Sequence, residues 1–202
     1  RWLYADNIAL DKWGNIYVSA NKIKDSYGTV ELFKLNSTGN ILWTKSFKTP
    51  HDTIKGYSNA SALRTDTLGN VYTVGNFRGT IDFNPGPDSI KLSTSSIQDY
   101  DIFVSKLDSA GNYIFVKQIG ADQMEEPIEA VLDSANIYFT GKFGGTVDFD
   151  PGAGTTNLTA QYSDVFICKL SLSGNFVWAK SLVSTNNTYC QASSILLDPS
   201  GN

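Results

Sequence analysis

The chain has 202 residues, of which 41% are hydrophobic and 18% are charged, and its formal net charge is −4. This composition predicts a folded chain. The low, slightly acidic charge argues against a nucleic-acid partner, whose phosphates require a basic face, and no apolar run approaches the roughly 20 residues of a membrane-spanning helix, so we expect no membrane insertion.

Short runs rich in Val, Ile, Tyr, Phe and Thr, bounded by Gly, Asn, Asp and Ser, predict strands throughout the chain. The first group is expected over residues 8–10, 16–20, 30–35 and 41–47. The next two groups are expected over 60–65, 71–77, 102–107 and 113–119, and over 128–132, 137–143, 165–170 and 176–182. Each later group carries an insertion, with short strands at 80–83 and 89–93 in one and a hairpin over 146–159 in the other. A last strand is expected over 193–197.

The three groups are copies of one repeat. Equivalent positions hold Tyr17, Tyr72 and Tyr138; Lys34, Lys106 and Lys169; Trp43, Phe115 and Trp178; and Lys45, Lys117 and Lys180. Four antiparallel strands per repeat, joined by Gly-Asn turns, are typical of β-propeller blades. A β-sandwich would explain the alternating strands but not the aligned positions. We therefore predict an all-β fold, a β-propeller segment over residues 1–202 with blades at about 7–48, 59–120 and 128–183 and the start of a fourth at 190–202.

The pattern Asp-x-x-Gly-Asn recurs in the turns between paired strands. It begins at Asp11, Asp66, Asp108 and Asp198, and Asn36 and Ser171 replace the Asp in two further turns. The Asp side chain can cap such a turn, and Gly takes the left-handed position that follows. Paired catalytic carboxylates of a glycosidase must instead face one another across a substrate. Because these Asp residues recur with the repeat, we interpret them as structural.

The repeat resembles the SBBP-type β-propeller repeat, within the broader group of NHL-like and YVTN-like propellers. Three motifs carry the resemblance: D-x-x-G-N-[IV]-Y, G-T-[IV]-D-F-[DN]-P-G and D-[IV]-F-x-x-K-L-x-x-x-G-N-x-x-[WF]-x-K. In the first copy, residues 21–29 replace the second motif. The resemblance implies an extracellular or cell-surface bacterial protein, exported by type IX secretion with a separate sorting domain. It says little about molecular function, because propellers host many functions.

The chain opens on Arg1 and closes on Gly201-Asn202, inside an expected turn. We therefore expect it to be a piece of a longer polypeptide whose targeting signals lie elsewhere. Each blade buries its faces against its neighbours, so the two open ends are expected to need partners. These partners would be further blades of the same chain or another surface protein.

Few residues of the sequence suggest a catalytic site, a metal site or a binding site. The one histidine, His51, has no nearby residues that complete a catalytic or metal site. Asp82, Asp148 and Asp150, with Asn84, could offer oxygen ligands to calcium, although two carboxylates per loop fall short of the usual six to eight ligands; ordinary turn chemistry is the favoured interpretation. The repeated Lys45, Lys117 and Lys180 are interpreted as a solvated strand face. The repeated aromatic residues are interpreted as packing between blades rather than a glycan platform.

Five tripeptides read Asp, then Ser or Thr, then an aliphatic residue. Bacteria with the SBBP-type family often O-glycosylate such tripeptides, which implies candidate sites at Thr53, Thr67, Ser89, Ser109 and Ser134. The same tripeptides are also ordinary turn chemistry. Cys168 and Cys190 are expected as free thiols, because they fall on strands at different radii of a propeller.

We predict a non-enzymatic extracellular β-propeller interaction module, used for adhesion, display or docking to a cell-surface complex, with no cofactor. One alternative is a carbohydrate-active enzyme or lyase whose site lies in blades outside this sequence. Another is a glycan-binding lectin, which would expose aromatic side chains in its repeated loops.

Overall fold

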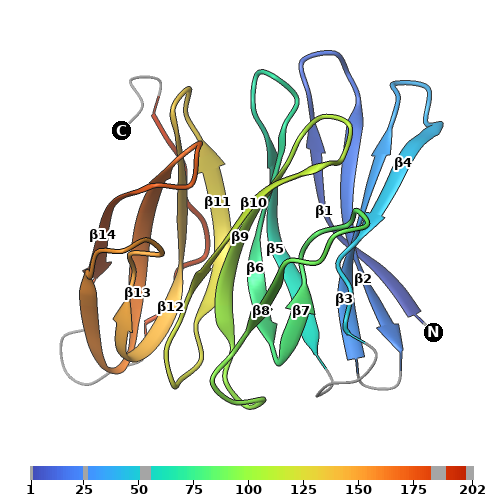
Figure 1. The fold of residues 1–202 in the computed structure, drawn as a ribbon. Coiled ribbons are helices and arrows are strands. Elements are labelled where there is room, and N and C mark those ends of the chain that lie inside the picture. Colours follow the sequence, from blue (N-terminus) through green and yellow to red (C-terminus); the bar gives the residue numbers. More distant parts are fainter. Residues whose placement is uncertain (1, 25–26, 51–55, 183–189, 199–202) are drawn as a thin grey trace.

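The computed structural model describes residues 2–24, 27–50, 56–182 and 190–198. Within these ranges the chain forms fourteen strands and no helix (Figure 1), and so contains no helix that could cross a membrane. The strands are β1 (Trp2–Leu10), β2 (Ile16–Lys24), β3 (Tyr27–Leu35), β4 (Ile41–Ser46), β5 (Tyr57–Thr65), β6 (Val71–Arg78), β7 (Thr80–Asp82), β8 (Lys91–Ser93), β9 (Asp101–Leu107), β10 (Tyr113–Ile119), β11 (Glu126–Leu132), β12 (Asn136–Asp148), β13 (Asn157–Ser171) and β14 (Phe176–Leu182). The prediction of an all-β fold is confirmed.

The strands form three antiparallel four-stranded units, which follow one another along the chain (Figure 1). Unit 1 holds β1 to β4, unit 2 holds β5, β6, β9 and β10, and unit 3 holds β11 to β14. Units 1 and 2 share one larger sheet, joined by a single parallel pair between Gly28 and Tyr57. Neither this sheet nor that of unit 3 closes on itself.

The insertions lie where the sequence placed them. In unit 2 the insertion is a separate hairpin of β7 and β8. In unit 3 it continues β12 and β13, with Thr146 opposite Thr159 and Asp148 opposite Asn157. The predicted strand over 193–197 is wrong, because residues 190–198 form no strand. A strand needs a neighbour to pair with, and no strand of the described chain pairs with this segment.

The first strand of each unit carries a bulge at the same place. The register of β1 shifts between Ala5 and Asn7, that of β5 between Ala60 and Ala62, and that of β11 between Pro127 and Glu129. A bulge bends its strand and increases the local twist. The three units therefore repeat a local distortion as well as a strand order.

Burial follows the order of the units. Strands β6 and β9 of unit 2 are buried along nearly their whole length, whereas β1 is largely exposed. Alternate side chains of a strand point to opposite faces, so a strand buried throughout is covered on both faces. Unit 2 therefore lies between units 1 and 3, and β1 has an uncovered face.

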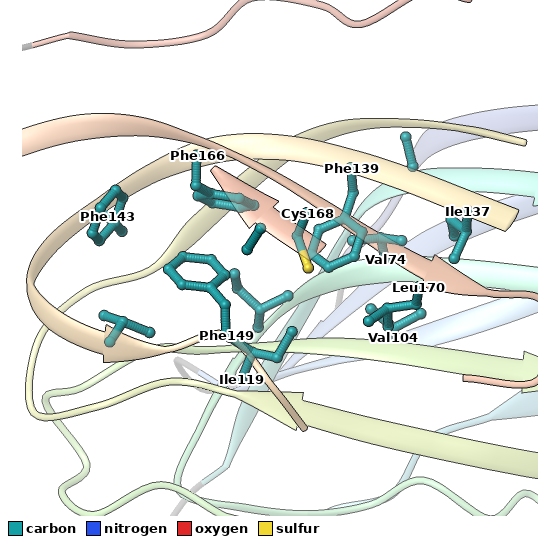
Figure 2. Close-up of a cluster of buried hydrophobic side chains, with 14 of the residues drawn as sticks. Val74, Val104, Ile119, Ile137, Phe139, Phe143, Phe149, Phe166, Cys168 and Leu170 are labelled. Atoms are coloured by element: carbon teal, nitrogen blue, oxygen red, sulfur yellow. The ribbon is translucent and has the colours of Figure 1, made fainter. Parts of the chain in front are cut away.

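Two hydrophobic cores fill the spaces between units. One combines Tyr17, Val30 and Phe47 of the unit 1 region with Phe77 and Phe103 of unit 2. The other joins unit 2 to unit 3, where Val74 and Val104 face Phe139, Phe166 and Cys168 (Figure 2). Each insertion contributes a fully buried phenylalanine, Phe83 to the first core and Phe149 to the second. The insertions thus add buried aromatic side chains to the cores between units.

Candidate functional site

The repeated Asp residues organise their own turns. Asp11 Oδ1 accepts hydrogen bonds from the backbone N–H groups of Trp13 (3.0 Å) and Asn15 (2.9 Å), and its Oδ2 accepts one from the Tyr17 hydroxyl (3.1 Å). Asp66 and Asp133 make the same contacts with Tyr72 (3.3 Å) and Tyr138 (2.8 Å).

These hydrogen bonds stabilise the charged carboxylates. In Asp133, burial opposes ionisation, but bonds from Ala135, Asn136 and Tyr138 together lower the pKa to about 2. The pKa of Asp11 is likewise lowered, because the bonds from its turn outweigh its burial. Hydrogen bonds to the charged form of a carboxyl group lower its pKa, so the group loses its proton at a lower pH than usual. This arrangement suits a structural role.

A lysine lies over each of the repeated tyrosine rings. The ammonium-to-centroid distance is 5.1 Å for Lys34 over Tyr17, 4.8 Å for Lys106 over Tyr72 and 4.7 Å for Lys169 over Tyr138. A cation within about 6 Å of a ring face is attracted by the ring quadrupole. Each unit therefore places its repeated lysine against its repeated tyrosine ring.

In units 1 and 2 this lysine, together with one aromatic side chain of its unit, donates to a backbone carbonyl of the next unit, a contact that we call the inter-unit clasp. Lys34 Nζ donates to Ser109 O at 3.0 Å and the Trp43 indole donates to the same carbonyl at 3.2 Å. Lys106 Nζ and the Tyr72 hydroxyl both donate to Leu172 O at 3.0 Å.

The accepting carbonyls occupy equivalent places. Ser109 and Leu172 are each the second residue of the turn between the third and fourth strands of their unit. Sequence analysis aligned the tyrosines and lysines but missed the clasp, since its acceptors lie 66 to 100 residues from their donors.

A cavity of about 580 Å³ lies between unit 1 and the β7–β8 hairpin. Its wall includes Lys22, Lys48, Lys91, Asp82 and Ser89. Lys22 pairs with Glu31 at 3.3 Å, and Lys48 Nζ donates to Gly86 O at 3.3 Å. The three ammonium groups outnumber the one carboxylate of the wall, Asp82, and an excess of positive charge around a cavity favours an anionic ligand. No repeat motif marked this site, because its two sides come from different units.

Asp82, Asp148 and Asp150, the calcium candidates, accept hydrogen bonds from backbone N–H groups of their own loops. Asp82 Oδ1 accepts from the N–H groups of Asn84 (3.1 Å) and Ile90 (2.9 Å). Asp148 Oδ1 accepts from Asp150 (3.0 Å) and Thr156 (2.8 Å), and Asp150 Oδ1 accepts from Gly152 (2.8 Å). Across the described ranges no group of three or more His, Cys, Asp or Glu residues is placed to hold a metal ion. Calcium binding stays a prediction.

Four of the glycosylation candidates are exposed in turns or loops: Thr67, Ser89, Ser109 and Ser134. Thr53 lies outside the described residues, as does His51. Both cysteines are free, as expected, with Cys168 fully buried and Cys190 half-buried.

Two buried carboxyl groups that the sequence did not single out lie side by side at the junction of units 2 and 3. Tyr100 and Met124 form a parallel bridge, so the residues after them, Asp101 and Glu125, project to the same side. Asp101 Oδ1 and Glu125 Oε1 have no hydrogen-bond partner among the described residues. Burial, reinforced by the neighbouring acidic groups, raises the pKa of Asp101 to about 6 and that of Glu125 to about 8.

The fold and the clasps define an all-β repeat protein of stacked four-stranded units. In comparisons with known proteins, no family model matches the chain and no curated protein matches it.

Proposed function

We propose that units 1, 2 and 3 are consecutive blades of a β-propeller and that the chain is a non-enzymatic interaction module. The observation that carries the proposal is the inter-unit clasp, in which the repeated lysine donates to the same turn carbonyl of the next unit at both joints. Propellers repeat four-stranded sheets radially, and one joint reproduced twice is what radial repetition requires.

The use of the repeated polar residues supports a module without catalysis. Asp11, Asp66 and Asp133 are occupied in turns, and Lys34 and Lys106 are occupied in clasps. Three of the residues that line the cavity beside β7 and β8 are lysines, which suit binding of an anionic ligand more than acid–base chemistry at neutral pH. We place the ligand contact in the lysine-lined cavity beside β7 and β8.

An acidic glycan is the ligand class that we favour for this cavity, which makes the lectin alternative a special case of the proposal. Resemblance of the repeat motifs to the SBBP-type family supports an extracellular, type IX-secreted location, where such glycans are met. A protein taken from its native host is then expected to carry extra mass on at least one of the five candidate residues, Thr53, Thr67, Ser89, Ser109 and Ser134. Peptides covering these sites that all show the masses of the bare sequence would contradict glycosylation but not binding.

The binding experiment is calorimetric titration of the whole chain with an acidic oligosaccharide such as oligogalacturonate, and with its neutral counterpart. We expect the acidic ligand to bind better, and the double variant Lys48→Glu with Lys91→Glu to bind it at least about tenfold more weakly. The matched control is Lys12→Glu with Lys180→Glu, which makes the same charge change at exposed lysines outside the cavity wall.

Three outcomes would count against the proposal. Equal binding by both double variants would remove the cavity as the site. No binding by the native chain would remove the ligand class. Release of new reducing ends during the titration would favour the carbohydrate-active enzyme instead.

A further inference from the structure

Each of the two joints between units contains one parallel backbone bridge. Gly28 pairs with Tyr57 at the joint between units 1 and 2, and Tyr100 pairs with Met124 at the joint between units 2 and 3. The two bridges are equivalent, because Tyr57 and Met124 both stand nine residues before the Asp of the turn that follows. The residues that come directly after each bridge can therefore be compared.

These residues differ in charge between the two joints. At the joint between units 1 and 2 they are Thr29 and Ser58, and the fully buried Ser58 hydroxyl accepts a hydrogen bond from the Val30 N–H at 3.2 Å. At the joint between units 2 and 3 they are Asp101 and Glu125. One joint is thus built with neutral side chains at these places, so the architecture itself does not require a pair of carboxyl groups there.

The carboxyl pair is almost completely buried, and its charge is not compensated. Asp101 is 4% exposed and Glu125 is 0% exposed. Asp101 Oδ1 and Glu125 Oε1 lack hydrogen-bond partners, and no ion pair among the described residues includes either group. Burial, and then the nearby carboxylates of Asp99 and Asp122, raise the pKa of both groups. A buried carboxylate without a partner is strongly destabilising, so this pair needs either protons or a cation.

Both carboxyl groups lie beside the same short segment of backbone. A Cβ built on Gly120 would collide with Oδ1 of Asp101, so this oxygen lies against the glycine. The second oxygen of Glu125, Oε2, accepts a hydrogen bond from the Ala121 N–H at 3.2 Å. Because Gly120 and Ala121 are consecutive, the carboxyl group of unit 2 and that of unit 3 are gathered at one place.

A polar cavity of about 400 Å³ opens at this place. Its wall includes Asp101, Gln118, Asp122 and the hydroxyl side chains of residues 93–95. The Gln118 amide donates to Asp101 Oδ2 and to Ser93 O, which fixes one oxygen of Asp101 and leaves Oδ1 without a donor. A water molecule takes about 30 Å³, so the cavity has room for water that completes the coordination of an ion.

We propose that Asp101 and Glu125 bind a calcium ion at the joint between units 2 and 3. Two carboxylates balance the double positive charge of the ion, and calcium accepts carboxylate, carbonyl and water oxygens in a flexible geometry. Asp101 Oδ1 and Glu125 Oε1 are the charged ligands, and neutral oxygens of the cavity and its water supply the others. The site is separate from the loop candidates Asp82, Asp148 and Asp150, and the inference goes beyond the proposed function.

The ion would cross-link two units. Asp101 is the first residue of β9 in unit 2, and Glu125 directly precedes β11 of unit 3. Binding displaces the protons that the buried pair otherwise holds, so the affinity for calcium should rise with pH. Calcium sites of extracellular modules have dissociation constants of about 10⁻⁴ to 10⁻³ M, and we expect this site to lie in that range.

The test is calorimetric titration of the full chain with calcium chloride at neutral pH, repeated with magnesium chloride. We expect calcium to bind and magnesium to bind more weakly, since magnesium demands a nearly ideal octahedral site. Melting curves supply a second measurement. In about 10 mM calcium the melting temperature should rise by at least about 3 °C, because the ion binds the folded chain and not the unfolded one.

Asp101→Asn and Glu125→Gln should each weaken calcium binding at least about tenfold, since each removes one of the two charged ligands. Without calcium neither variant should melt below the native chain, because each removes a buried ionisable group, so a loss of binding would not reflect a loss of folding. The matched control is Glu126→Gln, the same change at the next residue, whose carboxylate pairs with Lys142. This control should bind calcium like the native chain.

Three results would overturn the proposal. If the native chain binds no calcium at about 10 mM, the pair holds only protons. Calcium binding that survives both Asp101→Asn and Glu125→Gln, or that is lost in Asp150→Asn instead, would place the ion in a loop. Magnesium bound as tightly as calcium would remove calcium as the preferred ion. None of these results depends on whether the lysine-lined cavity binds a glycan.

Discussion

At the scale of single residues, the role of a repeated lysine depends on whether another unit offers it an acceptor. Lys106 donates to Leu172 O and lies 3.8 Å from Asp66 Oδ2, whereas Lys169 only covers its tyrosine. Lys106→Met should therefore lower the free energy of unfolding by about 1–3 kcal/mol, since it removes a largely buried charged hydrogen bond. Urea denaturation of a dilute sample measures the loss.

Lys169→Met is the control for that substitution. It makes the same chemical change at the same place in the repeat, and in a dilute sample it should alter the free energy of unfolding by less than about 0.5 kcal/mol. Equal losses at Lys106 and Lys169 would show that stacking on tyrosine, rather than the clasp, stabilises the fold.

Glu125 gives a pH dependence whose sign follows from its burial. Its pKa is raised from an ordinary 4.5 to about 8, so the folded chain holds the proton more tightly than the unfolded chain. The stability contributed by this protonation is present below pH 4.5 and is lost as the pH rises through about 8. Asp101, with a pKa raised to about 6, adds to the loss in the lower part of that range.

Glu125→Gln removes this titration while keeping the shape of the side chain. We expect the variant to melt at least about 4 °C above the native chain at pH 8.5, with a smaller difference at pH 4.5. Melting curves at a series of pH values measure it. Glu126→Gln, which changes a surface carboxylate paired with Lys142 at 2.8 Å, is expected to leave the pH profile unchanged; an equal effect there would contradict the assignment.

Residue roles could be predicted from the sequence only where they were local. The Asp of each turn bonds within six residues, so its structural role was readable from the repeat. Lys45 and Lys117 were interpreted as a solvated face, yet their stems cover Gly111 and Gly174 of the next unit. Contacts of this kind depend on how the units stack, and the sequence pattern of a single unit carries no information about stacking.

At the scale of elements, the bulges of the first strands bring backbones close together and make particular glycines necessary. Gly75 lies opposite the bulge of β5, and a Cβ built there would stand within contact distance of Asn59 O and the Phe103 ring. Gly75→Ala should therefore lower the free energy of unfolding by about 2–4 kcal/mol, because the clash is with backbone. Denaturant titration measures it.

Unit 1 offers the reverse control. Ala20 stands opposite the bulge of β1, as Gly75 does for β5, and is fully buried, so the pairing of β1 with β2 already accommodates a methyl group. Ala20→Gly should cost only about 1 kcal/mol, through lost packing and added chain entropy. If Gly75→Ala were no more costly than Ala20→Gly, the strands of unit 2 would have room that the structure does not show.

Strands and hairpins were predictable because alternation and turn residues are local signals, and β10 and β14 begin and end where the sequence predicts. Bulges were not, since Asp6, Ser61 and Ile128 share no chemistry that marks them. The segment over 193–197 has the composition of a strand and forms none. Composition specifies a tendency, and a pairing partner is needed to realise it.

At the scale of the whole molecule, unit 2 contributes side chains to both hydrophobic cores. One core fills the joint between units 1 and 2, and the other fills the joint between units 2 and 3. In such a stack, stability is approximately a sum of unit and nearest-neighbour terms. A substitution in one joint should therefore loosen that joint more than the other. The two clasp lysines, Lys34 and Lys106, allow this to be tested, because each holds one joint.

Cys168 is the natural probe for this test. Its thiol is fully buried in the core between units 2 and 3, and burial raises its pKa, so it should resist alkylation until that joint opens. Cys190 is half-buried and should react first. When the native chain is treated with iodoacetamide, mass spectrometry of the peptide that holds Cys168 then measures how often the joint between units 2 and 3 opens.

Lys106→Met should speed alkylation of Cys168 about tenfold or more, since each 1.4 kcal/mol lost from the joint raises its open population about tenfold. Lys34→Met removes the equivalent bond from the joint between units 1 and 2 and should speed the reaction by a much smaller factor. Equal acceleration would mean that Cys168 reacts only after the whole stack unfolds together. Unequal acceleration would mean that the joint between units 2 and 3 opens while unit 1 stays packed, as the separate cores require.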